Sequence, residues 1–208
     1  FMGIWTLKIS GEEKYEYGSD LEPNWYLLGA NKISDILSES ERRIENNSLN
    51  HKWCNKYDEQ NRPYDIIIVN NRMKSTLYIK TLCLKKIPFE KALKTWTLDI
   101  NKSQIEKQIE NPVDYYICCI WDKKIDLLRI VGWIERKEVI KLIGNNEIEK
   151  GNKKYINLIT NKTFYDTTYK IPLNKLEHMK TLFLKLGIDA DFAKYDDTDE
   201  RQNSLDFY

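Results

Sequence analysis

The sequence is poor in histidine and cysteine, and this shortage excludes several kinds of site. Among its 208 residues are two histidines, His51 and His178, and four cysteines. Cys118 and Cys119 are adjacent in a strand-like run, where successive side chains point to opposite faces of a sheet. Their spacing is neither that of a zinc-binding CxxC pair nor that of a disulfide framework. We therefore expect buried, reduced thiols and no catalytic machinery built on histidine.

Long apolar runs and an excess of one charge are also missing. No segment approaches the roughly 20 apolar residues that span a bilayer, and the first residues lack the basic-then-apolar layout of a signal peptide. We expect an intracellular protein, cytoplasmic or nuclear, with no membrane partner. The 33 Lys and Arg residues balance 32 Asp and Glu residues, so composition alone does not indicate nucleic-acid binding. Any site for a polyanion has to be a local patch.

Tyrosine and tryptophan, in contrast, are abundant. The chain contains 13 Tyr and 6 Trp residues, and 41% of its residues are hydrophobic, which favours a folded chain over a disordered one. The length suits one domain of ordinary size. We predict a single domain over residues 1–188 and an acidic, flexible tail over residues 189–208.

Apolar patterning predicts the order of strands and helices. Strands are expected over residues 4–9, 65–69, 76–84, 94–100, 114–121 and 126–134, edge or covering strands over 152–160 and 163–173, and helices over 31–46, 101–111, 135–145 and 172–186. The run at 114–121 is almost continuously apolar, so we expect it to be covered on both faces. This order is typical of an α/β fold with a mixed central sheet flanked by helices.

The last of these helices has a regular apolar pattern. Its apolar residues at helical spacing are Leu173, Leu176, Met179, Phe183 and Leu186. Pro172 suits a first helical turn, and Gly187 suits an end. The sequence therefore predicts one continuous helix, with His178 on its flank.

Two polar residues interrupt the apolar strands near the centre of the sequence. Asp65 opens one strand-like run, and Lys80 lies inside the next. The polar segment between them contains Asn70 and Asn71, which tolerate the backbone conformations of a hairpin loop. Side chains of adjacent strands lie within reach of each other. A magnesium-dependent phosphodiesterase needs carboxylates to hold the cation and a lysine beside the phosphate.

The run DIIIV, a hairpin loop and the run LYIKT, residues 65–81, together resemble the PD-(D/E)xK nuclease superfamily, which has the restriction-endonuclease-like fold. The order of helices and strands extends the resemblance over about residues 32–142. The resemblance implies that Asp65 is a catalytic, metal-binding aspartate and that Lys80 is the catalytic lysine. It also implies Mg²⁺ or Mn²⁺ as cofactor and DNA as partner, with a homodimer as one form of assembly.

Further residues outside the hairpin follow from the same resemblance. Glu41, on the preceding helix, is the best match to an additional catalytic and metal-binding carboxylate, although Glu39 and Glu45 compete. Gln104 and Lys107 lie one turn apart on a short predicted helix. Comparable helices flank the cleft in the resembling fold, so these two side chains are expected to contact DNA phosphates.

One position departs from the family pattern. The family has a glutamate or aspartate two residues before the lysine, whereas this chain has Tyr78. A tyrosine is neutral near pH 7 and supplies no formal charge to a divalent cation. Efficient two-metal catalysis then requires another carboxylate to take its place. Asp99 and Glu90 are available, but the sequence does not place them.

Each of these residues also has an ordinary structural interpretation. Asp65 can cap a strand end, Lys80 can extend along its strand to the sheet edge, and Glu41 can be a solvated helix residue. Gln104 and Lys107 can form the exposed face of an amphipathic helix. The lysine pairs at 85–86, 123–124 and 153–154 form either a phosphate-tracking patch or ordinary solvated surface.

Three functions are left open by the sequence. The first is a DNA-acting, Mg²⁺-dependent phosphodiester hydrolase with a variant active site. The second is a catalytically inactive protein of the same fold that serves as a nucleic-acid-binding or assembly module. The third is a protein-interaction module, in which exposed Trp25, Trp53 and Trp133 form a partner surface, since aromatic residues are enriched at interfaces.

Overall fold

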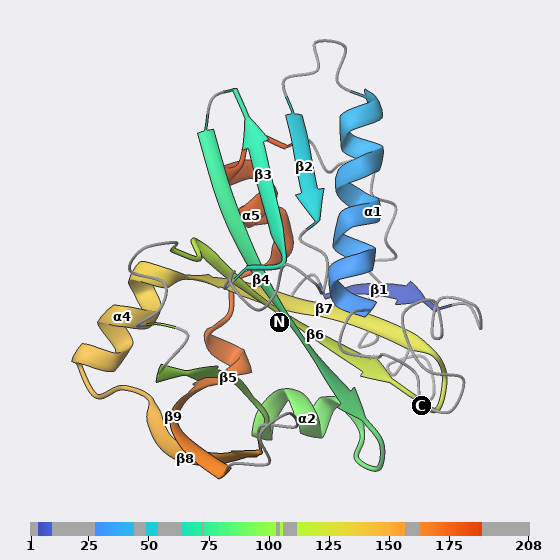
Figure 1. Cartoon of the computed structure of the whole chain (residues 1–208). Coiled ribbons are helices and arrows are strands. Elements are labelled where there is room, and N and C mark those ends of the chain that lie inside the picture. Colours follow the sequence, from blue (N-terminus) through green and yellow to red (C-terminus); the bar gives the residue numbers. More distant parts are fainter. Residues whose placement is uncertain are drawn as a thin grey trace, which may run out of the picture.

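The computed structural model describes residues 4–9, 28–43, 49–53, 64–71, 73–102, 105, 112–156 and 163–188. Their elements, shown in Figure 1, are β1 (Trp5–Lys8), α1 (Leu28–Arg43), β2 (Leu49–Trp53), β3 (Ile66–Asn70), β4 (Met73–Leu84), α2 (Phe89–Thr95), β5 (Thr97–Asn101), β6 (Tyr115–Asp122), β7 (Leu127–Glu135), α4 (Arg136–Gly144), β8 (Glu149–Ile156), β9 (Thr163–Pro172), the 3-10 turn η2 (Leu173–Lys175) and α5 (Met179–Lys185). The predicted fold class, α/β with a mixed sheet flanked by helices, is confirmed.

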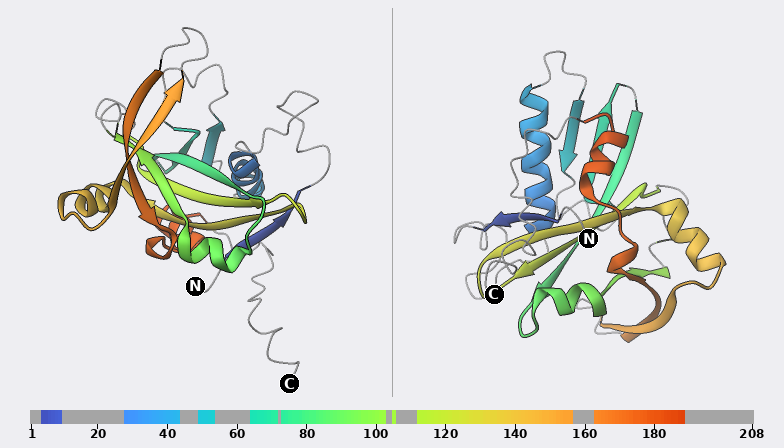
Figure 2. Two further views of the ribbon diagram at one scale, coloured as in Figure 1. Left: turned by 90° about the horizontal axis from the view of Figure 1, so that it is seen from below. Right: turned by 180° about the vertical axis from the view of Figure 1, so that it is seen from behind.

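Six strands form the main sheet in the order β1-β7-β6-β4-β3-β2. All neighbours are antiparallel except β4 and β6, which are parallel. Parallel neighbours require a crossover connection that leaves the sheet and returns. Here the crossover contains α2 and β5, and β5 joins β9 and β8 in a second, three-stranded sheet. Figure 2 shows this small sheet and α4 beside the main sheet.

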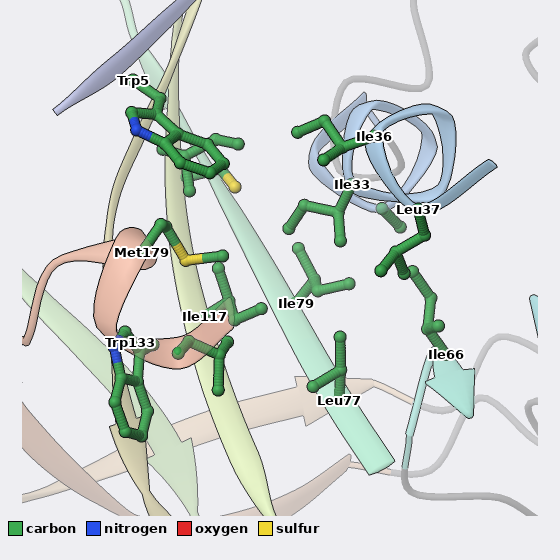
Figure 3. Packing of buried hydrophobic residues seen from close by; sticks show 14 of the residues in the cluster. Trp5, Ile33, Ile36, Leu37, Ile66, Leu77, Ile79, Ile117, Trp133 and Met179 are labelled. Carbon is green, nitrogen blue, oxygen red and sulfur yellow. The ribbon is translucent and has the colours of Figure 1, made fainter. Parts of the chain in front are cut away.

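Hydrophobic cores lie on both faces of the main sheet. The α1-side core contains Ile33, Ile36 and Leu37 of α1, packed against Ile66 and Ile79 of the sheet (Figure 3). The other, which we call the α4-side core, contains side chains of α2, α4 and the small sheet. Every residue of β6 from 115 to 121 is buried, as its unbroken apolar sequence predicts.

The adjacent cysteines separate as the strand pattern predicts. Cys118 belongs to the α4-side core and Cys119 to the α1-side core, and both are fully buried. Cys83 on β4 is half-buried, and all three of these thiols are free. The expectation of buried, reduced thiols therefore holds for the two cysteines of β6.

Gly29 allows α1 to approach the sheet closely. Its backbone N–H donates to Thr81 Oγ1 at 3.1 Å. A Cβ atom at this position would lie 2.7 Å from Thr81 Oγ1 and 2.8 Å from Cys119 Sγ. Any larger residue would push the first turn of α1 off the strands β4 and β6.

The predicted hairpin is present, with a turn shorter than the sequence indicates. β3 and β4 pair from Ile66 and Leu77 down to Asn70 and Met73. Asn71 adopts a positive φ of 46°, the left-handed conformation that asparagine tolerates. Three residues that read as loop, 73–75, belong to β4, because one strand end of a hairpin is solvated and accepts polar side chains.

The prediction of one helix over 172–186 is wrong in its first half. After η2, the backbone of Glu177 forms an isolated bridge with Trp133, with N–H to O distances of 2.9 and 2.8 Å. Gly132 permits this approach, since a Cβ there would collide with the Glu177 carbonyl. His178, predicted on the helix flank, instead caps the start of α5 and accepts from Lys180 N–H. Backbone pairing with β7 thus overrides the helical periodicity.

Candidate functional site

Asp65 lies immediately before β3 and extends its pairing with β4. Its backbone N–H donates to the Leu77 carbonyl at 2.8 Å, and its Oδ2 accepts from the Ile79 N–H at 2.5 Å. The side chain thus takes the place of a backbone carbonyl at the end of the β3–β4 ladder. Asp65 therefore caps a strand end, as its structural interpretation predicts. Tyr78 lies between Leu77 and Ile79, the two residues to which Asp65 is hydrogen-bonded.

Lys80 lies on the face of the main sheet that bears the α4-side core. Strand residues alternate between faces: Ile79 packs into the α1-side core, whereas Tyr78 and Leu82 pack against the α4-side core. Lys80 is half-buried. Burial lowers the pKa of its ammonium group, and the charge of Lys153 on β8 lowers that pKa further. Lys80 is therefore a strand lysine held inside the fold rather than one extended into solvent.

Two carboxylates counter these effects on Lys80. Asp99 and Asp65 both raise the pKa of Lys80 by their negative charge, and the effect of Asp99 is the larger. Asp99 lies on β5, is half-buried, and accepts from Thr97 Oγ1 at 2.6 Å. The same carboxylate raises the pKa of the Cys118 thiol, which burial brings to about 12. We call Asp65, Lys80, Asp99 and Lys153 the Lys80 cluster.

Asp99 is one of the two carboxylates whose charge raises the pKa of Lys80. Of the two carboxylates available to replace the missing one, Asp99 raises the pKa of Lys80, whereas Glu90 is exposed on α2. The sequence signal for Asp99 is an acidic residue inside the apolar strand TLDI. That signal resembles the one at Asp65. The sequence does not show that Asp99 acts on Lys80, because this depends on how the small sheet packs.

Glu41 lies away from the Lys80 cluster. Its carboxylate binds His51 on β2, accepting from the backbone N–H and lying 2.7 Å from the ring Nδ1. His51 pairs with Ile68, whose side chain is part of the α1-side core. Glu41 is therefore on the opposite face of the sheet from Lys80. The structure does not bring the Glu41 carboxylate together with Asp65. Glu39 lies on the same helix, and Glu45 lies outside the described residues.

A hydrogen-bonded chain runs from Ser34 through His51 to Glu41. Ser34 Oγ lies 2.8 Å from His51 Nε2, and Glu41 lies on Nδ1. The carboxylate accepts the Nδ1 proton, and in a neutral imidazole Nε2 then accepts from the serine hydroxyl. This is the order of groups in a catalytic triad. However, Ser34 is inside α1, where backbone N–H groups are used by the helix and supply no oxyanion donors. We interpret the chain as a link between α1 and β2.

The remaining predicted contacts fall into two groups. Gln104 and Lys107, expected on DNA phosphates, lie outside the described residues, as does Trp25; the side chain of Trp53 is not described either. Trp133 was expected on an exposed partner surface, and this is wrong. Its side chain is 2% exposed, and its Nε1–H donates to the His178 carbonyl at 2.9 Å.

The carboxylates of the Lys80 cluster can be compared with the ligands that the expected Mg²⁺ or Mn²⁺ needs. Within the part of the chain that the structure describes, no group of three or more His, Cys, Asp or Glu side chains is arranged to hold a metal ion. Mg²⁺ is often held by one or two carboxylates, with waters and substrate phosphates completing its coordination. The Lys80 cluster contains two carboxylates, Asp65 and Asp99, which is the number that this second arrangement uses. They do not make a preformed metal cage.

Comparisons with known proteins give no family assignment. No family model, no curated protein and no solved structure matches the chain. Among the described residues, no helix is long and apolar enough to cross a membrane. Function is therefore inferred from the residues of the chain and their arrangement.

Proposed function

We propose that the chain is a DNA-acting protein of the restriction-endonuclease-like kind, and that the Lys80 cluster is a variant site for phosphodiester hydrolysis. The observation that carries the proposal is a half-buried Lys80 whose charge is countered by two carboxylates from different strands, Asp65 and Asp99. A buried lysine with paired carboxylates is costly unless the charges serve a purpose. A phosphate with a bound cation satisfies all three groups at once.

The roles of the residues follow from their charges. The ammonium group of Lys80 offsets negative charge on the phosphate and orients the attacking water. Water attacks phosphorus and gives up a proton to solvent, the bond from phosphorus to the leaving oxygen breaks, and that oxygen takes a proton from solvent. Asp65 and Asp99 would hold the cation, and Mg²⁺ or Mn²⁺, when bound, supplies a Lewis acid for the phosphoryl oxygens. Because Asp65 also caps the β3–β4 ladder, we expect slow turnover.

The arrangement of strands supports the same proposal. The resemblance concerns a hairpin that carries an aspartate and a lysine, followed by a crossover and a central apolar strand. The chain has a β3–β4 hairpin, an α2–β5 crossover and β6 parallel to β4. This topology holds Asp65 and Lys80 on neighbouring strands. It supports the family resemblance independently of the degenerate motif at Tyr78.

Nicking of supercoiled plasmid DNA in Mg²⁺ or Mn²⁺ tests the proposal. We expect slow, metal-dependent nicking that falls at least about tenfold in Lys80→Met and in Asp99→Asn. Glu90→Gln is the matched control, since it removes an exposed carboxylate from the same crossover. Equal nicking by Asp99→Asn and the unaltered protein would reject Asp99 as a site residue. No nicking of DNA or RNA by folded protein with either metal would reject the enzyme.

A specific observation favours a second candidate, a nucleic-acid-binding protein without turnover. The position of the missing carboxylate is filled by Tyr78, whose ring packs edge-on against Tyr116 with ring centroids 5.9 Å apart. A tyrosine packed in this way occupies space that a cation and its waters would need. This candidate requires DNA binding that weakens steeply with salt. Binding that does not change between about 50 and 200 mM salt would contradict it.

A further inference from the structure

The small sheet presents an exposed two-stranded ribbon at one side of the molecule. We define the β8–β9 ribbon as Glu149–Ile156 and Thr163–Pro172, which pair antiparallel along their full length. β8 is an edge strand, because the sheet order is β5-β9-β8. Figure 2 shows the ribbon as a long twisted pair that extends beyond the main sheet. Its outer part is therefore open to a partner.

Tyr165 on β9 is unusually exposed for an aromatic residue. Its side chain is 70% exposed, the largest fraction among the large hydrophobic side chains of the described residues. It pairs in register with Lys154, which is also exposed. Asn152, two residues along on the same face of β8, is exposed as well. An aromatic ring beside a lysine and an amide is the combination that stacks a base and binds its phosphate.

Lys153 connects this surface to the Lys80 cluster. It is exposed, and strand alternation places it on the opposite face of β8 from Lys154. Its charge nevertheless reaches Lys80, whose pKa it lowers. The two neighbouring lysines therefore lie on opposite faces of the ribbon, and Lys153 is the one whose charge acts on the pKa of Lys80.

The charge of the ribbon suits a polyanion. Its described residues include four lysines, at positions 150, 153, 154 and 170, against two carboxylates, Glu149 and Asp166. Glu149 is bound to Lys170 at 2.5 Å, at the end of the ribbon near η2. Lys153 pairs in register with Asp166, so the excess is Lys150 toward the η2 end and Lys154 beside Tyr165. This local excess exists although the whole chain carries a formal charge of only +1.

We propose that the β8–β9 ribbon binds single-stranded nucleic acid, with a base stacked on Tyr165 and the adjoining backbone held by Lys154 on the same face. Stacking on a side chain needs a base that is free of its neighbours, which a duplex does not offer. The inference rests on the proposed function and adds the form of its substrate: a single strand, or a duplex with an unpaired segment.

The other occupant of such an edge is another protein. Lysines on edge strands also protect a sheet against pairing with a second strand, and an exposed aromatic residue also serves protein interfaces. In either case the ribbon would have no preference for nucleic acid. The experiment below separates these outcomes.

Fluorescence anisotropy with a labelled oligonucleotide of about 20 nucleotides, single-stranded or duplex, tests the inference. We expect tighter binding to the single strand, and a loss of about 5- to 100-fold in Tyr165→Ala. Tyr165→Phe is the matched control, because it keeps the aromatic face and is expected to bind nearly as the unaltered protein does. Circular dichroism checks that each variant is folded.

The salt dependence of binding tests the lysines separately. Lys154→Gln is expected to reduce the slope of log K against log salt by about 0.7, the value for one phosphate contact on a single strand. Lys124→Gln, in the exposed turn between β6 and β7, is the control and is expected to leave the slope unchanged. An unchanged slope in Lys154→Gln would remove Lys154 from the contact.

Two results would overturn the inference without affecting the proposed function. One is single-strand binding that Tyr165→Ala and Lys154→Gln leave unchanged, with nicking intact. The other is a preference for the duplex. In contrast, Lys80→Met is expected to lose nicking while Tyr165→Ala still weakens single-strand binding in that background, so loss of nicking alone leaves the ribbon in place. No binding of either oligonucleotide would reject both the ribbon and a DNA-acting protein.

Discussion

The carboxylate of Asp65 accepts a hydrogen bond of 2.5 Å from the backbone N–H of Ile79, two strand positions from the residue to which the Asp65 backbone donates. The negative charge of the same carboxylate also raises the pKa of Lys80. One side chain thus has both a structural and an electrostatic connection to the candidate site. Substitutions at Asp65 must therefore be measured for stability as well as for activity.

Asp65→Ala is expected to lower the free energy of unfolding by about 1–3 kcal/mol. The change leaves the Ile79 N–H without its charged acceptor at a partly buried position. Asp65→Asn keeps an acceptor oxygen and is expected to lose less. Urea denaturation measures both values. Equal stability of the unaltered protein and Asp65→Ala would show that the strand cap contributes nothing.

Glu41→Gln and His51→Ala are expected to destabilise the protein by about 1–2 kcal/mol each and to leave nicking unchanged. Both side chains belong to the link between α1 and β2, on the face away from Lys80. Their effects should be non-additive, with a coupling of at least about 0.5 kcal/mol in a double-mutant cycle. Ser40→Ala, at a hydroxyl that bonds only within α1 to Ile36 O at 3.0 Å, is the control for helix effects.

Metal-dependent nicking that disappeared in Glu41→Gln, with stability unchanged, would contradict this assignment. Glu41 would then act in catalysis as the family resemblance implies. Circular dichroism at the assay temperature separates loss of activity from loss of folded protein.

The stability of the protein is expected to depend on the charge of Lys80. Burial lowers the pKa of Lys80 below its ordinary 10.5, so the unfolded chain binds the proton more tightly than the folded chain does. Stability therefore rises with pH between the folded and the unfolded pKa of this group. Relative to Lys80→Met, the unaltered protein should gain stability as the pH increases from about 8 to about 11.

Urea denaturation at a series of pH values measures this difference. Lys91→Met, at an exposed position on α2, is the control. The difference in stability between the unaltered protein and this variant is expected not to change with pH. A difference between the protein and Lys80→Met that falls with rising pH would mean that Asp65 and Asp99 outweigh burial. The sign of the change in this difference with pH therefore decides whether burial or the two carboxylates have the larger effect on the pKa of Lys80.

Tyr78→Glu is expected to increase metal-dependent nicking, by at least about tenfold if the missing ligand limits the rate. The substitution adds a carboxylate between the two residues that Asp65 bonds. Tyr78→Gln introduces a side chain of the same size as Tyr78→Glu but without its charge. It controls for loss of the ring contact with Tyr116. Equal nicking by the two variants would show that charge at this position does not limit the reaction.

Gly29→Ala is expected to destabilise the protein by about 1–3 kcal/mol, because its Cβ would overlap Thr81 Oγ1 and Cys119 Sγ. Gly144→Ala is the control. A Cβ at Gly144 meets nothing within 4 Å, so this change is expected to be neutral or to stabilise by up to about 1 kcal/mol. Thermal unfolding of the two variants checks the difference, and a neutral Gly29→Ala would show that α1 can move away from the sheet.

Much of the fold can be predicted from the sequence because its central elements are strongly patterned. The continuous apolar run of β6 and the asparagine turn between β3 and β4 each have a direct physical meaning. β2 was not predicted: its sequence LNHKW alternates polar residues, and its pairing depends on β3. α2 was also missed, since it has only seven residues and follows Pro88 without a side-chain cap.

The candidate site was only partly predictable. Asp65 and Lys80 lie on adjacent strands of one hairpin, so local sequence is sufficient to place them together. Asp99 and Lys153 come from two strands of the other sheet, and their positions depend on how that sheet packs. Glu41 illustrates the reverse error: a carboxylate on the expected helix is held by His51 on β2, a strand that the sequence does not predict.

The crossover between β4 and β6 also has a consequence for the order of folding. Asp65 and Lys80 come together as soon as the β3–β4 hairpin forms, which is a local event. Asp99 reaches its position only after β5 has found β9, a pairing between residues far apart in the chain, and such non-local contacts form slowly. A chain with the hairpin formed and the small sheet unformed would lack the charges of Asp99 and Lys153 that act on Lys80. The environment of Lys80 would thus be completed late in folding.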